Sequence, residues 1–131
     1  MKYFVSLITT LFFAFSCSDS PDHRPEQISH TFLSAYFSLD FEQFLPLCCE
    51  ALRNDLERSA QSVRGLSPET MEKLRNDLIA YSFEIEKIDL NHTKDSAFVS
   101  YIIFTPEALN GIDSRLTLIK EENEWRVAKL L

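Results

Sequence analysis

Hydrophobic positions follow two different periods along this chain. Between Pro25 and Ala80 they recur at steps of three and four residues, which predicts amphipathic helices. From Tyr81 onward they alternate with polar positions, which predicts β-strands. Helices therefore come first and strands follow. This segregation predicts an α+β fold in which N-terminal helices pack on one face of a four-stranded antiparallel sheet.

The first helix is expected to run from Pro25 to Leu39. Proline suits the first helical turn because its missing amide hydrogen would have no partner there, and Glu26 favours the positive end of the helix. The apolar residues of this segment recur at helical steps and form one face: Ile28, Phe32, Ala35, Tyr36 and Leu39.

Two further helices are expected before the strands. The segment from Asp40 to Gln43 has the pattern of a capping box, which predicts a helix start. Pro46 lies inside the apolar pattern of this second helix and is expected to kink or divide it, and Gly65 ends the segment. The third helix is expected to begin at Ser67-Pro68-Glu69, which combines a cap, a first-turn proline and an acid, and to end near Ala80.

The first two strands are expected between Tyr81 and Phe104. In the first, the hydrophobic alternation shifts by one residue near Glu86-Lys87, which predicts a β-bulge. The polar residues 91–95 predict a turn. The run 97–104 is apolar on both faces, so it is expected to be the central strand, covered by helices on at least one side.

The last two strands are expected after a loop that contains Pro106 and Asn110-Gly111. The third strand is predicted from Ile112 to Lys120, where apolar and polar residues alternate. A turn at residues 121–124 then leads into the fourth strand, which begins at Trp125.

Composition indicates a single compact domain. The chain has 131 residues, with eleven phenylalanines and two glycines, which favours a core with few flexible loops. Its net charge is −7 at pH 7, so the basic surface that binds nucleic acid is absent and no nucleic-acid partner is predicted. The same charge opposes adsorption to an anionic membrane surface, so any membrane attachment requires an anchor.

The first residues of the chain have a separate pattern. Met1-Lys2 is followed by the apolar run 3–15, the small Ser16 and Cys17, and then by polar residues. This is the order of a secretory signal, and the run is shorter than the about 20 apolar residues that a spanning helix needs. It resembles a bacterial lipoprotein signal. An ordinary secretory cut at the same place is the alternative, because lipoprotein signals usually have Leu where this chain has Ala14.

The lipoprotein resemblance implies three segments: a signal peptide at residues 1–16, a polar tether at residues 17–24 that begins with a lipidated Cys17, and one domain at residues 25–131. Acyl chains such as palmitate on Cys17 would anchor the protein in a membrane of the bacterial cell envelope. Ser18 is not the Asp that retains enteric lipoproteins in the inner membrane, so the outer membrane is favoured over the inner one.

The remaining cysteines and the histidines do not form a recognisable ligand set. Cys48 and Cys49 are adjacent, so they are expected to be reduced and partly buried, with an intermolecular disulfide as the alternative in an oxidising compartment. His23, His30 and His92 lie in the tether, a helix and a turn, without the spacing of metal ligands. No metal site and no cofactor are predicted.

The layout resembles the nuclear-transport-factor-2-like fold, in particular the small bacterial lipoproteins of unknown function that use it. Four segments carry the resemblance: Pro25 to Leu39 as a first helix, the short step from Leu39 to Phe41, Asp95 to Val99 as a strand opening, and Leu116 to Val127 as a closing hairpin. The resemblance implies a cone of curved antiparallel sheet around helices. This fold hosts isomerases, dehydratases, ligand binders and interaction modules, so it does not by itself name an activity.

Isomerases of this fold place a carboxylate base opposite an oxyanion donor inside the cone. The donors that this chain offers are Tyr36, Tyr81 and Tyr101, and the bases are Asp89 and Asp113. Core or surface positions are the favoured interpretation of all five, so no catalytic residue is predicted. A periplasmic isomerase or dehydratase that uses a pocket carboxylate and a tyrosine is the alternative function.

The favoured function is a lipid-anchored binding or interaction module that holds a partner protein or a small apolar ligand in the cone. Six aromatic residues are predicted to line its concave face: Phe32, Tyr36, Phe83, Phe98, Tyr101 and Trp125. The strand at residues 97–104 is apolar on both faces, which also permits a homodimer through the sheet.

Overall fold

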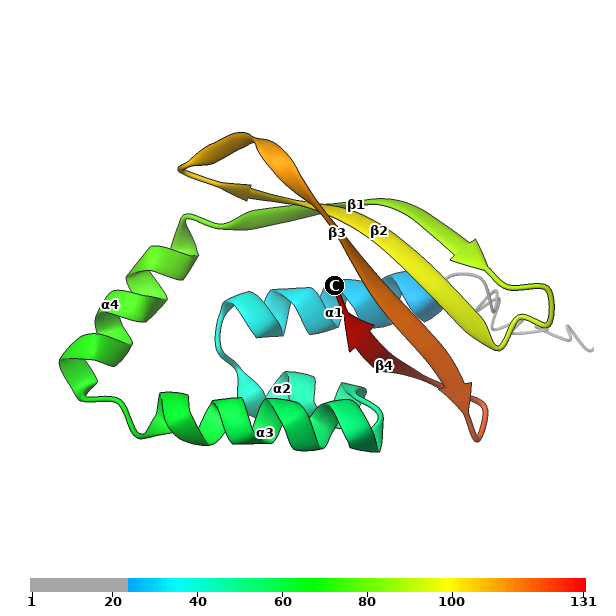
Figure 1. The fold of residues 1–131 in the computed structure, drawn as a ribbon, viewed down its shortest axis with the longest axis horizontal. Coiled ribbons are helices and arrows are strands. Elements are labelled where there is room, and N and C mark those ends of the chain that lie inside the picture. The colour runs from blue at the N-terminus through cyan, green and yellow to red at the C-terminus, as the bar shows by residue number, and fades with distance from the viewer. Residues whose placement is uncertain (1–23) are drawn as a thin grey trace, which may run out of the picture.

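The structure is a computed structural model that describes residues 24–131, so the predicted signal peptide and Cys17 lie outside the described residues. Figure 1 shows the arrangement of its elements. In chain order these are α1 (Arg24–Phe37), α2 (Phe41–Phe44), the 3-10 helix η1 (Leu45–Leu47), α3 (Glu50–Arg64), α4 (Pro68–Ile79), β1 (Ser82–Leu90), β2 (Ser96–Thr105), β3 (Ala108–Glu121) and β4 (Glu124–Leu130).

The four strands form one antiparallel sheet in the order β1-β2-β3-β4, so each strand pairs with its neighbour in the chain. The sheet is curved and twisted, and α1 lies against its concave face (Figure 1). The predicted α+β fold is therefore confirmed, with β2 as an inner strand. None of the helices described in residues 24–131 combines the length and the apolar character that crossing a membrane requires.

The core lies between α1 and the facing side of β2, β3 and β4. Phe32 and Leu33 of α1 have no exposed surface, and neither do Val99 of β2, Leu116 of β3 and Val127 of β4. Each of these large side chains contributes about 1.5 to 3 kcal/mol to the free energy of unfolding by leaving water. This cluster fixes α1 on the sheet and so positions the residues at the C-terminal end of that helix.

Pro46 divides the predicted second helix, as expected. The chain forms the short α2, tightens into η1, and passes through the extended Cys48 and Cys49 before α3 begins. The predicted capping box is wrong, because the side chain of Asp40 makes no capping hydrogen bond. The backbone oxygen of Asp40 instead accepts from the amides of Gln43 and Phe44, the last two residues of this four-residue helix, at 3.1 Å each.

The predicted start of α4 is confirmed in detail. The hydroxyl of Ser67 accepts a hydrogen bond from the Thr70 amide at 3.3 Å, and Pro68 occupies the first turn. No residue of α4 is buried, although Met71, Leu74 and Leu78 are half-buried along one side. Figure 1 shows α4 at one side of the molecule, where it connects α3 with β1.

The strand region contains one confirmed irregularity and one correction. The register of β1 against β2 shifts between Ile85 and Lys87, which confirms the predicted bulge. The predicted loop through Asn110-Gly111 is wrong, because β3 already begins at Ala108 and both residues lie within it. Gly111 has φ +89° in an irregular part of the β2–β3 ladder, a conformation that glycine adopts without the strain of a side chain.

Candidate functional site

The six predicted lining residues do not share one cavity. Phe32, Tyr101 and Trp125 are buried in the core, with at most 6% of their surface exposed. Phe98 is 48% exposed and alternates with buried neighbours along β2, so it lies on the face of the sheet away from the helices. Only two of the six, Tyr36 and Phe83, border the hollows between α1 and α4.

Two adjoining hollows lie between the C-terminal half of α1, α4 and the start of β1. They share Phe37, Leu78 and Tyr81, and together we call them the α1–α4 cleft. The outer hollow has a volume of about 580 Å³ and reaches His30 and Phe83. This volume lies within the range of about 300 to 1,000 Å³ that is typical of small-molecule sites.

The inner hollow of the cleft has a volume of about 310 Å³ and lies against α2 and α3. Its lining is almost entirely apolar, and beyond the shared residues includes Tyr36, Phe41, Phe44, Leu56 and Val63. Figure 1 shows the elements that bring these residues together, with α2 and α3 below α1 and α4 beside them.

Aromatic contacts hold the walls of the cleft. The ring of Phe37 stacks on Phe83 with 6.1 Å between centroids and lies 6.2 Å from Tyr81. His30 meets the edge of Phe83 at 5.4 Å, and Tyr36 lies 5.5 Å from Phe44. Such pairs add about 0.5 to 1.5 kcal/mol each beyond the burial of their surfaces, so the aromatic wall on the α1 side is well ordered.

The charge on the lining of the cleft differs from that of the chain as a whole. Neither hollow is bordered by an aspartate or a glutamate, although the chain has a net charge of −7. Arg75 of α4 borders the outer hollow and forms no ion pair among the described residues. The other polar groups of the outer hollow are His30, Tyr81 and serine hydroxyls such as Ser34.

Two of the catalytic candidates, Tyr101 and Asp113, meet at a third hollow of about 380 Å³. Burial raises the pKa of Tyr101, and a hydrogen bond to Ser114 opposes this rise. Asp113 is exposed to water. Asp89 is also exposed and pairs with Lys87 at 3.4 Å. Neither carboxylate is therefore enclosed opposite a donor in the way that an isomerase site requires.

Cys48 and Cys49 form no disulfide within the described residues and are both buried, which confirms the expected burial, and their reduced state stays a prediction. Burial, assisted by the charge of Cys49, raises the pKa of Cys48 to about 12. A thiol with this pKa is protonated at neutral pH and reacts slowly as a nucleophile. Among residues 24–131, no group of three or more histidine, cysteine or acidic side chains is arranged to hold a metal ion.

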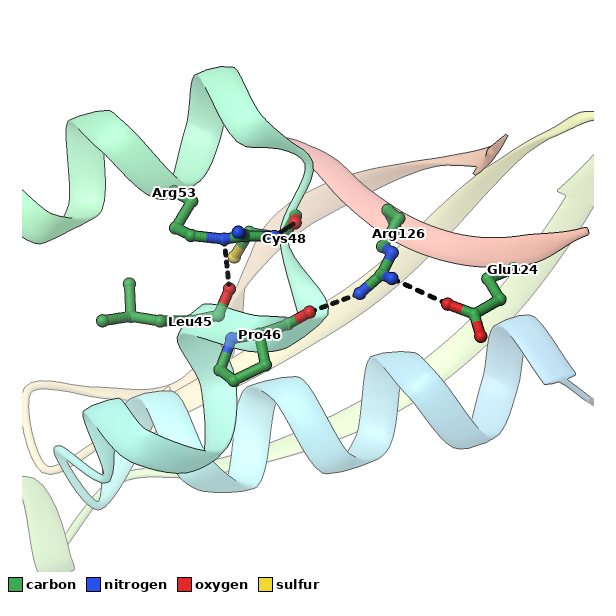
Figure 2. Close-up of polar contacts among 6 residues, drawn as sticks. All are labelled: Leu45, Pro46, Cys48, Arg53, Glu124 and Arg126. Carbon is green, nitrogen blue, oxygen red and sulfur yellow. Dashed lines mark hydrogen bonds and ion pairs between the residues drawn. The ribbon is translucent and has the colours of Figure 1, made fainter. Parts of the chain in front are cut away.

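Two arginines that the sequence did not single out fasten the chain where Pro46 interrupts the helix (Figure 2). Arg53 donates from Nε to the Leu45 oxygen at 3.3 Å and from Nη2 to the Cys48 oxygen at 3.0 Å. Arg126 of β4 donates to the Pro46 oxygen and pairs with Glu124 at 2.7 Å.

Beside these arginine contacts, the Cys49 amide donates to the Val127 oxygen at 2.9 Å. These contacts give partners to the carbonyl and amide groups that the break at Pro46 leaves without helical hydrogen bonds. A buried backbone group without a partner would be costly. No sequence period signals such contacts, since Arg126 and Pro46 lie 80 residues apart in the chain.

Comparisons with known proteins identify the fold of this chain and nothing beyond it. No protein-family model and no curated protein match the chain. Among solved structures, the chain is similar to a crystal structure from Campylobacter jejuni that is named as an NTF2-like transpeptidase. The TM-score is 0.50 with 18% sequence identity, over 80% of this chain and 97% of that chain. Together with the helices packed on a curved four-stranded sheet, this similarity shows that residues 24–131 have the nuclear-transport-factor-2-like fold.

Proposed function

We propose that this protein is a lipid-anchored binding module of the bacterial cell envelope that holds a small apolar ligand in the α1–α4 cleft. The observation that carries the proposal is the lining of this cleft, which is concave, aromatic and free of acidic residues. Apolar pockets with a few polar groups at their edge are typical of sites that bind small molecules. Binding in this cleft requires no reacting group.

The anchor part of the proposal rests on the sequence around Cys17. A short apolar run, a small residue and this cysteine precede a polar segment, and the described domain begins with α1 at Arg24. Acylation of Cys17 would therefore hold the domain a few residues from the bilayer. More than one acyl chain is needed for durable attachment, because a single chain binds membranes reversibly.

Replacement of Cys17 by Ser tests the anchor. Metabolic labelling with radioactive palmitate in a bacterial host is expected to mark the wild-type protein and to leave the Cys17→Ser variant unlabelled in the soluble fraction. Cys48→Ser is the control, because this cysteine is buried in the domain and is expected to keep the label. An unlabelled wild-type protein would support an ordinary secretory cut instead.

Binding of a neutral apolar dye tests the cleft. N-phenyl-1-naphthylamine is expected to gain fluorescence with the wild-type protein, and Leu78→Gln is expected to weaken the binding about tenfold or more, because a polar amide then faces both hollows. Leu109→Gln makes the same change at a leucine that is 80% exposed and outside the cleft, and should leave binding unchanged. Equal binding by all three proteins would reject the cleft as the site.

A catalytic role is the second candidate, and the hollow shared by Tyr101 and Asp113 is the observation that favours it. The transpeptidase name of the structural neighbour points in the same direction. Against a cysteine-based reaction, the pKa of Cys48 is raised to about 12 by burial. Turnover of an isomerase or peptide substrate that is lost in Asp113→Asn and in Tyr101→Phe would establish this alternative.

A homodimer through the sheet remains a prediction. The outer face of β2 exposes Phe98, and Ile102 and Phe104 beside it are partly exposed. Sedimentation velocity of the wild-type protein and of Phe98→Glu would show whether this face associates.

A further inference from the structure

The distribution of charge around the α1–α4 cleft restricts the ligand more closely than its apolar lining does. Acidic residues outnumber basic ones by twenty to thirteen in this chain. The neighbouring hollow at α2 is bordered by Asp40 and Glu42, and Arg75 lies between this hollow and the cleft because it borders both. The hollow at β3 is bordered by Glu86 and Asp113. The cleft itself is bordered by no acid in either of its hollows.

Arg75 is the only arginine or lysine among the residues that border the cleft. Three other arginines of the domain pair with acids, Arg58 with Asp55, Arg64 with Glu42 and Arg126 with Glu124, and Arg53 is engaged by backbone oxygens. Arg75 has no such partner among the described residues, and its side chain is exposed at the edge of the outer hollow. Its guanidinium is therefore available to an acidic group of a ligand, which it can hold by two parallel hydrogen bonds.

We infer that the ligand of the α1–α4 cleft is a single-chain amphiphile with an acidic headgroup, which rests on the proposed function of this cleft. The headgroup pairs with Arg75 at the edge of the outer hollow. The chain lies against Phe37, Leu78 and Tyr81, the residues that both hollows share, and extends toward the apolar inner hollow.

Helix α4 carries both the charged and the apolar contact that this ligand requires. Arg75 and Leu78 lie one helical turn apart on α4, so the same short segment contacts both the head and the chain. Because Arg75 is exposed, its attraction to the headgroup is partly screened by salt, and the preference for an acid should decrease at high ionic strength.

Competition against N-phenyl-1-naphthylamine on the full chain tests the headgroup. Dodecanoate, dodecyl phosphate, dodecanol and dodecyltrimethylammonium share one apolar chain and differ in charge. Both acids are expected to displace the dye at a concentration about tenfold lower than dodecanol, since a hydrogen bond to a charged group contributes about that factor. The cationic compound should be the weakest competitor. A difference between the two acids would identify the source of the headgroup as a carboxylate or a phosphate.

Three variants on one helix locate the effect. Arg75→Gln should abolish the preference for acids and leave the affinity for dodecanol unchanged, whereas Arg75→Lys should retain most of it. Lys73→Gln removes a charge two residues away, at a position that borders neither hollow, and should behave as wild type. A circular dichroism spectrum of each variant controls for the fold.

The outcomes separate the two proposals. If the acids and dodecanol compete equally in the wild type, the acidic headgroup is wrong while apolar binding stands. If none of the four compounds displaces the dye, or if the dye does not bind, the binding function of the cleft is wrong as well. If the acid preference survives in Arg75→Gln, the assignment of the headgroup to Arg75 is overturned.

Discussion

The two helices that border the cleft, α1 and α4, differ sharply in how they are held. Five residues of α1 are buried, among them Phe32 and Leu33, which are wholly inaccessible to water. No residue of α4 is buried. One wall of the cleft is therefore part of the hydrophobic core, whereas the other is attached mainly by half-buried side chains and by its links to α3 and β1. In such a cleft the aromatic wall on the α1 side can stay fixed while the α4 side adjusts to the ligand.

The sequence explains this difference. The apolar positions of α1 include large residues that meet the sheet, and they form a continuous stripe. In α4 the apolar positions are separated by charged and polar residues, and Ile79 is 79% exposed. Regions with little burial open with a smaller free-energy cost than the core, so the two helices are expected to respond differently to the same kind of mutation.

Truncation of one large side chain in each helix should give the largest difference in stability between α1 and α4. Phe32→Ala is expected to lower the free energy of unfolding by about 3 to 5 kcal/mol, because it leaves a cavity in the core. Leu74→Ala, in α4, should cost about 1 kcal/mol or less, since this side chain is half-buried. Urea unfolding followed by circular dichroism measures both. Similar losses would show that α4 is as well packed as α1.

The two glycines offer a second contrast, between the sheet and the C-terminal end of α3. Gly111 has φ +89°, and an added Cβ would lie 2.1 Å from Ile102 Cγ2, so Gly111→Ala should cost about 2 to 4 kcal/mol. Gly65 has φ −79° and no atom closer than 3.5 Å, so Gly65→Ala should be neutral or stabilise the protein by up to about 1 kcal/mol. Thermal unfolding of both variants checks the sign of each effect. A neutral Gly111→Ala would contradict the close packing of β2 against β3.

The dependence of stability on pH reports on the buried side of the molecule, where Cys48 lies. Burial raises the pKa of Cys48 from 9.0 to about 12, so the unfolded chain loses this proton at a lower pH than the folded one. The corresponding stabilisation is complete below about pH 9 and is lost as pH rises toward 12. Tyr101 has a pKa raised by burial and acts in the same direction.

Chemical denaturation at pH 8 and at pH 10.5 should therefore show a smaller decrease in stability for Cys48→Ala than for the wild type. Lys94→Ala, at an exposed turn position, is the control and should retain the wild-type dependence. A decrease of the same size in Cys48→Ala would mean that the thiol does not contribute.

Sequence periodicity predicted the local elements well because it reports which faces are buried. The shift near Glu86, the division at Pro46 and the cap at Ser67 all follow from properties of a few neighbouring residues. Contacts between segments that are distant in the chain are harder to predict from the sequence. The pair Asn110-Gly111 predicts a loop, because Asn-Gly usually marks a turn, whereas in the structure Gly111 permits a close approach between two strands.

The candidate site was only partly predictable for the same reason. The aromatic type of the lining was expected, and Tyr36 and Phe83 border the cleft. Phe98 lies on the other face, because a strand that is apolar on both faces does not reveal which of them meets the helices. The role of Arg75 could not be inferred from its neighbours in sequence, since it depends on which acids lie near the cleft in space.

The contacts from Arg126 and Val127 to the segment around Pro46 have a consequence for biosynthesis. Every residue of this linkage on the helical side leaves the ribosome long before its partners in β4 are made. During translation the Pro46 carbonyl and the Cys49 amide therefore lack their partners, and the side of η1 and α3 that contacts β4 stays open to a chaperone or a protease. The segment around Pro46 is therefore attached to the sheet late in synthesis, when β4 becomes available.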